Sequence, residues 1–242
     1  MKKIICKILI INLIILFFAP CLVLAETQKP ETDAGAAIII HPETDTIVYE
    51  KNSHEKMYPA STTKIMTALV AAESGHDLNE KVTVTEEAIS SIIEGYSTAH
   101  LKAGEEFTLE QLLNVLLIPS ANDAANVIAG YIGGSIPEFV NMMNKKAEEI
   151  GCTGTHFTSP NGLHDENHYT TAYDLAHIAI RVMKNTALRN IVCKTTYSLP
   201  ATSVYPYEDR IFTTTNNLLL EDSRLLLPFS NRCKNRIYNS CW

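Results

Sequence analysis

The hydrophobic and polar positions along the chain predict strands first, then several helices, then strands again. Residues 36–40 and 46–50 are runs rich in β-branched residues, and the polar segment 41–45 between them is typical of a β-hairpin turn. Residues 195–199 predict a further strand. This order indicates an α+β domain in which one antiparallel sheet is flanked by a cluster of helices. The first hairpin would take its partner strands from the C-terminal part of the chain.

The central part of the chain predicts helices. Residues 65–74 are apolar almost all round, which is typical of a helix buried in a domain centre, and Gly75 follows where a glycine commonly ends a helix. Thr108 and Gln111 form a capping-box pattern at the start of a helix that runs to about residue 117. Further helices are predicted over residues 122–132, 137–150 and 171–183.

Composition and charge exclude several classes of protein. The chain has 242 residues, of which 46% are hydrophobic and 19% charged, so it can bury a core and is not a disordered tail. A formal net charge of −7 argues against nucleic acid as the main partner, because such proteins normally carry a basic face. Beyond the N-terminal segment no long apolar run follows, which excludes a polytopic membrane protein.

Residues 1–25 have the pattern of a secretory signal peptide. A basic start precedes an apolar run, and Val23 and Ala25 fit a cleavage site. The alternative is an uncleaved membrane anchor. Asn12 and Pro20 interrupt the apolar run and disfavour it. Cleavage predicts an exported protein on the cell-wall side of the cytoplasmic membrane and leaves association with the membrane surface open. Residues 26–34 are polar and are expected to be a linker.

Ser61-Thr62-Thr63-Lys64 has the spacing of a serine nucleophile followed by a lysine base, at the start of the buried helix. Both side chains would share one face, and a neutral lysine could take the proton of the hydroxyl. Burial and nearby positive charge would lower the pKa of Lys64 toward that state. Ser53 and Lys56 repeat the spacing in a polar loop. Spacing alone therefore leaves open that Ser61 is a plain N-cap and Lys64 a solvated charge.

Ser120-Ala121-Asn122 follows an apolar run and Pro119, which predicts a turn between two helices. Such a turn could direct a hydroxyl and an amide into a cleft. Ser120 would then relay a proton between Lys64 and a leaving group, and Asn122 would bind a substrate amide. The alternative is that Ser120 or Asn122 caps the following helix.

His164-Asp165-Glu166-Asn167-His168 combines two imidazoles with two carboxylates, which raises the question of a metal site. The segment follows Pro160-Asn161-Gly162 in a predicted loop and lacks the helical H-E-x-x-H arrangement. Loop packing is therefore the favoured role, and Thr170 or Thr171 is expected to cap the next helix. The cysteine spacing shows no C-x-x-C pair, so no metal is expected there either.

Three segments resemble the serine-type D-alanyl-D-alanine carboxypeptidases, the low-molecular-mass penicillin-binding proteins of the peptidase S11 type. They are residues 58–69 (YPASTTKIMTAL), 120–125 (SANDAA) and 161–176 (NGLHDENHYTTAYDLA), in the order of that family. The resemblance implies a transpeptidase fold like that of β-lactamases and DD-peptidases, incomplete at its C-terminus, with the catalytic domain at residues 35–224.

The resemblance also implies the chemistry. Ser61 would attack the carbonyl between the two D-alanines of a peptidoglycan stem peptide and form an acyl-enzyme, with Lys64 as general base. Ser120 would pass the proton to the leaving amine, and Asn122 would hold the substrate. β-Lactams would acylate Ser61 because they mimic the D-Ala-D-Ala end, and no metal or organic cofactor is implied. A β-lactamase is disfavoured, because class A enzymes carry Ser-Asp-Asn in the second motif.

The third motif of the family, Lys-Thr-Gly, is absent from the sequence. Written with suitable codons and read one base later, residues 231–242 would give Thr-Gly-Val-Lys-Thr-Gly-Phe-Thr-Thr-Ala-Ala. We therefore hypothesise a frameshift near codons 224–225, with residues 225–242 as an out-of-frame tail. A gene whose shifted frame lacks Lys-Thr-Gly would exclude this hypothesis.

An alternative function follows from the missing motif. In the family it helps to form the oxyanion hole, and the loss of one oxyanion donor typically costs ~10²–10³ in rate. The alternative to an active carboxypeptidase is therefore a catalytically impaired homologue that at most binds β-lactam or cell-wall peptide.

Overall fold

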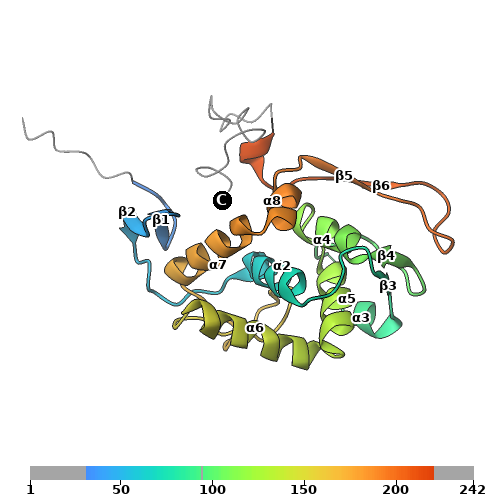
Figure 1. Ribbon diagram of the computed structural model, residues 1–242, viewed down its shortest axis with the longest axis horizontal. Coiled ribbons are helices and arrows are strands. Elements are labelled where there is room, and N and C mark those ends of the chain that lie inside the picture. Colours follow the sequence, from blue (N-terminus) through green and yellow to red (C-terminus); the bar gives the residue numbers. More distant parts are fainter. Residues whose placement is uncertain (1–30, 94, 221–242) are drawn as a thin grey trace, which may run out of the picture. The chain divides into compact units, whose positions relative to one another are not determined.

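The strands form three two-stranded antiparallel sheets within residues 31–93 and 95–220, the part of the chain that the computed structural model describes (Figure 1). The pairs are β1 (Ala37–His41) with β2 (Thr46–Lys51), β3 (Lys81–Thr83) with β4 (Glu106–Thr108), and β5 (Thr196–Leu199) with β6 (Arg210–Thr213). The predicted N-terminal hairpin and the strand near residues 195–199 are confirmed. Among the described residues no strand joins these pairs into a single sheet.

The two ends of the chain carry expectations that lie outside the described residues. These are the signal peptide at residues 1–25, most of the linker at 26–34 and the out-of-frame tail at 225–242. Ala34 begins the compact unit to which the secondary structure belongs. Along the described part of the chain, no helix combines the length and the apolar character needed to cross a bilayer.

Helix α2 (Lys64–Glu73) is the centre of the hydrophobic core, and all its residues from Lys64 to Ala71 are buried. It packs against α4, α5, α6, α7 and α8. The other helices are α3 (Glu86–Ser90), α4 (Leu109–Leu117), α5 (Asn122–Gly133), α6 (Ile136–Ile150), α7 (Ala172–Lys184) and α8 (Thr186–Val192), with short 3-10 turns η1 (Ala60–Thr63) and η2 (Asn217–Leu219). A helix buried on every side explains the apolar run that predicted it.

The predicted helix ends are formed by the residues expected from the sequence. Thr108 and Gln111 make both hydrogen bonds of a capping box at the start of α4. Gly151 ends α6 with φ = 89°, a left-handed conformation that favours glycine. Thr171 caps α7 by accepting a hydrogen bond from the backbone of Asp174.

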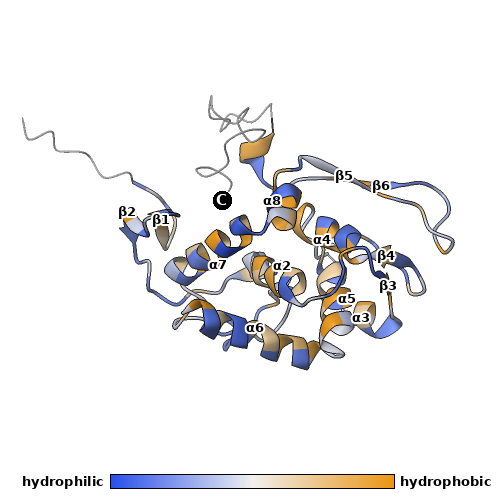
Figure 2. Cartoon of the chain, viewed as in Figure 1, coloured by the Kyte–Doolittle hydropathy of each residue, from blue (hydrophilic) through white to orange (hydrophobic). Residues whose placement is uncertain are grey.

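Helices α6 and α7 are amphipathic and cover the core from outside. The buried residues of α6 are Phe139, Met143 and Ala147, four positions apart, so one narrow stripe faces inward. Figure 2 shows the same division, with hydrophilic and hydrophobic residues alternating along both helices. The α+β class predicted from the sequence is confirmed. Five elements were not predicted, namely α3, α8, β3, β4 and β6, and each is only three to seven residues long.

Candidate active site

Ser61 lies in the 3-10 turn η1, directly before α2. In a 3-10 helix the side chains at positions i and i+3 are aligned, so this turn brings Ser61 and Lys64 together. The Nζ atom of Lys64 lies 3.1 Å from Ser61 Oγ and 3.0 Å from the carbonyl oxygen of Asn161. The N-cap positions of η1 and α2 are Pro59 and Thr63, and neither makes a side-chain capping bond. The alternative in which Ser61 is a plain N-cap therefore does not hold.

The two side chains of this pair differ sharply in exposure. Ser61 is exposed, whereas Lys64 is only 2% exposed, so the lysine is not a solvated charge. Burial lowers the pKa of Lys64 from 10.5 to about 8, and the Asp123 carboxylate partly opposes this shift. The sequence analysis also predicted that nearby positive charge would lower the pKa of Lys64. This prediction was wrong, because the charged group that acts on Lys64 is the carboxylate of Asp123. Burial brings the lysine toward its neutral form at mildly alkaline pH.

The loop of residues 156–170 is bonded to the chain on both sides of Ser61. Before the serine, the backbones of Met57 and Thr170 exchange two hydrogen bonds of 2.8 and 2.9 Å. After it, Thr67 Oγ1 donates to the carbonyl oxygen of Pro160 at 2.6 Å. The loop, whose Asn161 carbonyl accepts from Lys64, is thus anchored to the chain on both sides of Ser61.

His168 is buried in this loop and acts through both ring nitrogens. Its Nδ1 accepts a 3.0 Å hydrogen bond from the backbone N–H of Thr158, so Nε2 carries the proton and donates to Thr63 Oγ1 at 2.8 Å. Burial lowers the pKa of His168 from 6.5 to about 4, which keeps the ring neutral near pH 7. His168 therefore links the loop to the turn that carries Ser61.

The other histidine of this segment contacts the chain just before that turn. The ring of His164 makes an edge contact with Tyr58, with ring centroids 4.6 Å apart. These contacts support the loop-packing role favoured for the segment. No group of three or more His, Cys, Asp or Glu residues in the described part of the chain is placed to hold a metal ion.

Ser120 lies in the turn between α4 and α5, and Asn122 is the first residue of α5. Ser120 has φ = 65°, an uncommon left-handed conformation for a residue other than glycine. The N-cap of α5 is Ala121, without a side-chain bond, so neither Ser120 nor Asn122 serves as the cap. Among the described residues, neither side chain hydrogen-bonds to Ser61 or Lys64. Strain without a capping function is typical of a functional position.

Helix α5 reaches the serine–lysine pair through two residues that follow the turn. Asp123 is buried, and its carboxylate acts on Lys64 electrostatically. Asn126 donates from Nδ2 to the carbonyl oxygen of Ala88, and its Oδ1 accepts a 3.2 Å hydrogen bond from Asn161 Nδ2. Because the Asn161 carbonyl accepts from Lys64, Asn126 helps to place that acceptor.

A small hollow of about 60 Å³ opens beside the turn that carries Ser61. Its lining includes Ala60, Gly162 and Leu163, from the two segments described above. A larger hollow of about 370 Å³ lies between α6 and α7, and its lining contains none of the candidate residues. The lining of the smaller hollow also lacks Ser61, Lys64, Ser120 and Asn122, so the candidate site is defined by the contact between Ser61 and Lys64 and not by either hollow.

Three residues of this arrangement received no role from the sequence: Asp123, Asn126 and Asn161. Asp123 and Asn126 stand one and four residues after Asn122, on the first turns of the predicted helix. Asn161 accepts a hydrogen bond from Lys64 through its backbone carbonyl. Every residue has such a group, so the residue type at position 161 gives no signal of this contact. For His168 the sequence predicted loop packing, but its individual partners could not be predicted because they lie ten and 105 residues away.

The family model described as D-alanyl-D-alanine carboxypeptidase matches residues 24–225 of this chain. The carboxypeptidase DacF of Bacillus subtilis is 39% identical over 184 residues, which cover 73% of this chain and 46% of the relative. The carboxypeptidase DacC of Escherichia coli is 34% identical over 168 residues, which cover 66% of this chain and 42% of the relative. The chain thus spans less than half the length of these two relatives.

Solved structures share the fold. The crystal structure of a Streptomyces DD-transpeptidase superposes with a TM-score of 0.73 at 33% identity, over 81% of this chain and 78% of that one. The carboxypeptidase DacD of Francisella tularensis superposes with a TM-score of 0.69 at 30% identity, over 78% of this chain and 45% of that one. The fold expected from the sequence, that of the DD-peptidases, is confirmed.

Proposed function

The chain belongs to the peptidase S11 family of D-alanyl-D-alanine carboxypeptidases, and we propose that it removes the terminal D-alanine from peptidoglycan stem peptides. The observation that carries the proposal is the 3.1 Å contact between the buried Lys64 amine and the exposed Ser61 hydroxyl. An exposed hydroxyl can reach a peptide, and a buried amine can become its base.

The reaction begins with proton transfer from Ser61 to neutral Lys64. With a pKa of about 8, about a tenth of the lysine is neutral at pH 7 and half at pH 8. Ser61 Oγ then bonds to the carbonyl carbon between the two D-alanines. The C–N bond breaks as the leaving amine takes a proton, and the shortened peptide stays on Ser61 as an ester. Water hydrolyses this ester and restores the serine.

Ser120, just before α5, and Asn122, the first residue of α5, are proposed to act on the substrate. Ser120 would relay the proton from Lys64 to the leaving amine, and Asn122 would hold the backbone amide of the stem peptide. Their support is the strained conformation of Ser120, the absence of a capping role for either residue, and the link of α5 to Lys64 through Asp123 and Asn126. β-Lactams are proposed to acylate Ser61 by the same attack, because the lactam carbonyl replaces the scissile one.

A peptide assay tests the proposal. The full chain is incubated with an acylated Lys-D-Ala-D-Ala tripeptide and with the same peptide ending in L-alanine, and free alanine is measured. We expect release from the first peptide alone, and none with Ser61→Ala. Release that survives Ser61→Ala would contradict the proposal. Penicillin labelling of Ser61 without alanine release would favour the impaired homologue, which the absent Lys-Thr-Gly motif makes the second candidate.

We further propose that the protein acts outside the cytoplasmic membrane, on the cell-wall side. The support is the basic start and apolar run of residues 1–25 and the location of peptidoglycan itself. Expression of the full gene, followed by N-terminal sequencing of the exported chain, is expected to give Glu26 as the first residue. A product that keeps Met1 and stays inside the cell would contradict export.

A further inference from the structure

The loop of residues 97–101 contacts the chain on both sides of Ser120. The carbonyl oxygen of Ser97 accepts a 2.9 Å hydrogen bond from the backbone N–H of Asn122. The hydroxyl of Ser97 donates to the carbonyl oxygen of Pro119 at 2.6 Å. One residue of the loop thus contacts the residue just before Ser120 and the residue two positions after it.

Asp123 joins the same loop to the start of α5. Its carboxylate accepts hydrogen bonds of 2.9 and 3.1 Å from the backbone N–H of Ala99, and one of 3.0 Å from that of Leu101. The N–H groups of the loop therefore point toward α5. A displacement of the loop would move the N–H donors that Asp123 needs and the carbonyl that Asn122 needs.

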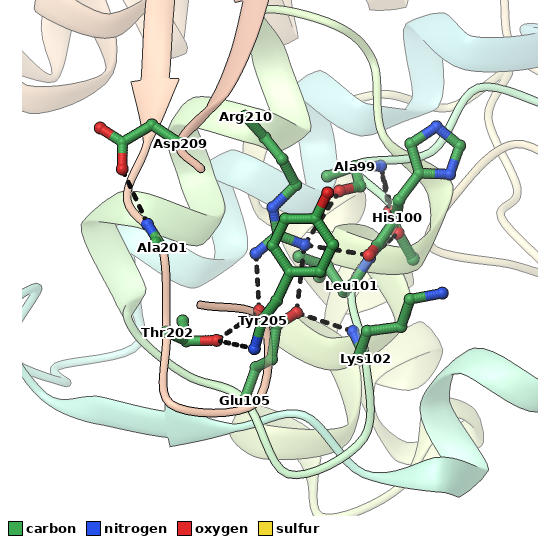
Figure 3. A network of polar contacts seen from close by, with 11 residues as sticks. Ala99, His100, Leu101, Lys102, Glu105, Ala201, Thr202, Tyr205, Asp209 and Arg210 are labelled. Atoms are coloured by element: carbon green, nitrogen blue, oxygen red, sulfur yellow. Dashed lines mark hydrogen bonds and ion pairs between the residues drawn. The ribbon is translucent and has the colours of Figure 1, made fainter. Parts of the chain in front are cut away.

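The carbonyl groups of the loop are held from the other side by Arg210 in β6. Its Nη1 donates to the carbonyl oxygen of His100 at 2.9 Å and approaches that of Ala99 at 3.4 Å (Figure 3). His100 has φ = 54°, so the loop contains a strained residue at the point of contact. A strained loop needs external contacts to keep its shape, and Arg210 provides them.

Arg210 is itself fixed by Glu105. The two side chains form a bidentate pair of 2.7 and 3.1 Å, in which Glu105 has no exposed surface and the Arg210 side chain is 9% exposed. The guanidinium also lies over the rings of Phe107 and Tyr205, with its central carbon 5.4 and 5.0 Å from the ring centroids. Figure 3 shows how Glu105 and the loop carbonyls converge on this one group. A planar guanidinium can serve these partners together, whereas a lysine ammonium cannot.

We propose that Arg210, paired with Glu105, is a positioning residue that holds Ser120 in place through the loop of residues 97–101. Buried ion pairs often contribute little net stability, because desolvation offsets their attraction. Their geometry remains useful, since the pair fixes the loop and the loop fixes the Ser120 turn. The inference rests on the proposed function for its catalytic consequence, but its structural part can be measured without substrate.

The test uses the double variant Glu105→Gln/Arg210→Met in the full chain. This variant removes both charges together, so no buried charge is left unpaired and we expect the variant to fold. Arg181→Met is the matched control, because it removes an arginine from another ion pair, with Glu73, on α7. Circular dichroism confirms folding of each variant before further measurement.

Amide hydrogen exchange and acylation are then compared with the wild type. In the double variant we expect faster exchange at Ala99, Leu101 and Asn122. Acylation of Ser61 by a fluorescent penicillin is expected to slow about 10- to 100-fold, the cost of a small misplacement in an active site. The control is expected to change neither. Wild-type exchange at these amides, or faster exchange with unchanged acylation, would overturn the proposal.

The two readouts separate this inference from the proposed function. A wild-type chain that penicillin does not acylate would refute the proposed function. Hydrogen exchange at Asn122 in the double variant would still decide whether Arg210 holds the turn. A double variant that does not fold is replaced by Arg210→Lys, which keeps the charge opposite Glu105 and loses the planar contacts with the loop.

Discussion

Gly162 packs against the carbonyl group of Ala60 so closely that a methyl group at position 162 would overlap it. The same added carbon would lie 3.0 Å from Thr63 Oγ1, which accepts from His168. Gly162 also has φ = 83°, in the left-handed region. The loop and the turn that carries Ser61 are thus in backbone contact, and the identity of residue 162 controls the position of Ser61.

Gly162→Ala is expected to displace the turn that carries Ser61. Strain at a left-handed φ costs about 1 kcal/mol, and overlap with a backbone carbonyl adds about 1–3 kcal/mol. Gly151→Ala is the matched control, because Gly151 has φ = 89° but no atom within 4 Å of the added carbon. Urea unfolding and penicillin labelling are measured for both. Equal losses in the two variants would contradict the role given to Gly162.

Acylation of Ser61 is expected to depend on the ionisation of Lys64. Because the base must be neutral and its pKa is about 8, the rate of labelling by a fluorescent penicillin should rise about tenfold per pH unit below that value and level off above it. Lys64→Arg keeps the positive charge and is expected to abolish labelling across this range. A flat profile in the wild type would show that another group takes the serine proton.

Ser120→Ala is expected to slow the reaction and to leave the free energy of unfolding nearly unchanged. Since Ser120 does not cap α5, its hydroxyl contributes little to the free energy of unfolding. As a proton relay it would contribute about 10²–10⁴ to the rate. The measurement pairs urea unfolding with D-alanine release. A destabilised variant that keeps its activity would assign Ser120 a structural role instead.

His168 is expected to make the fold sensitive to acid. Its pKa is about 4 in the folded chain and near 6.5 when unfolded, so between these values only the unfolded state binds the proton. The free energy of unfolding therefore decreases as the pH falls from 6.5 toward 4. His168→Gln keeps an amide donor toward Thr63 and cannot titrate. Urea unfolding at pH 7 and pH 5 is expected to show a smaller loss in this variant, and His54→Gln is the exposed control.

An unchanged acid sensitivity in His168→Gln would contradict this assignment. Protonation of Nδ1 breaks the hydrogen bond that this atom accepts from the backbone N–H of Thr158, although the Thr158 hydroxyl, 3.1 Å away, can accept from the new N–H. The N–H groups of Nδ1 and of the Thr158 backbone would then face each other, which is the physical reason for the expected loss.

The contact between Ser61 and Lys64 was predictable from the sequence because its geometry is local. Ser61 and Lys64 are three residues apart, and the apolar run after them already indicated that the lysine would be buried. The caps formed by Thr108 and Thr171 were predictable for the same reason, since each bonds within one helical turn.

The support of the site was not predictable, because it depends on contacts between distant segments. Asn161 lies 97 residues from Lys64, and Arg210 lies 105 residues from Glu105. Pairing of that kind follows from tertiary packing and leaves no periodic pattern in the chain. The short strand β6, which carries Arg210, has four residues and was missed for the same reason.

The identity of the nucleophile is tested most directly by locating the acyl group that benzylpenicillin leaves on the full chain. Intact-mass measurement and peptide mapping are expected to find one penicilloyl group, on the peptide that contains Ser61. The group should be absent from Ser61→Ala and retained in Ser53→Ala, whose serine has the same spacing to a lysine but donates to Glu50. An acyl group that persists in Ser61→Ala, or a wild-type chain that acquires none, would contradict the account.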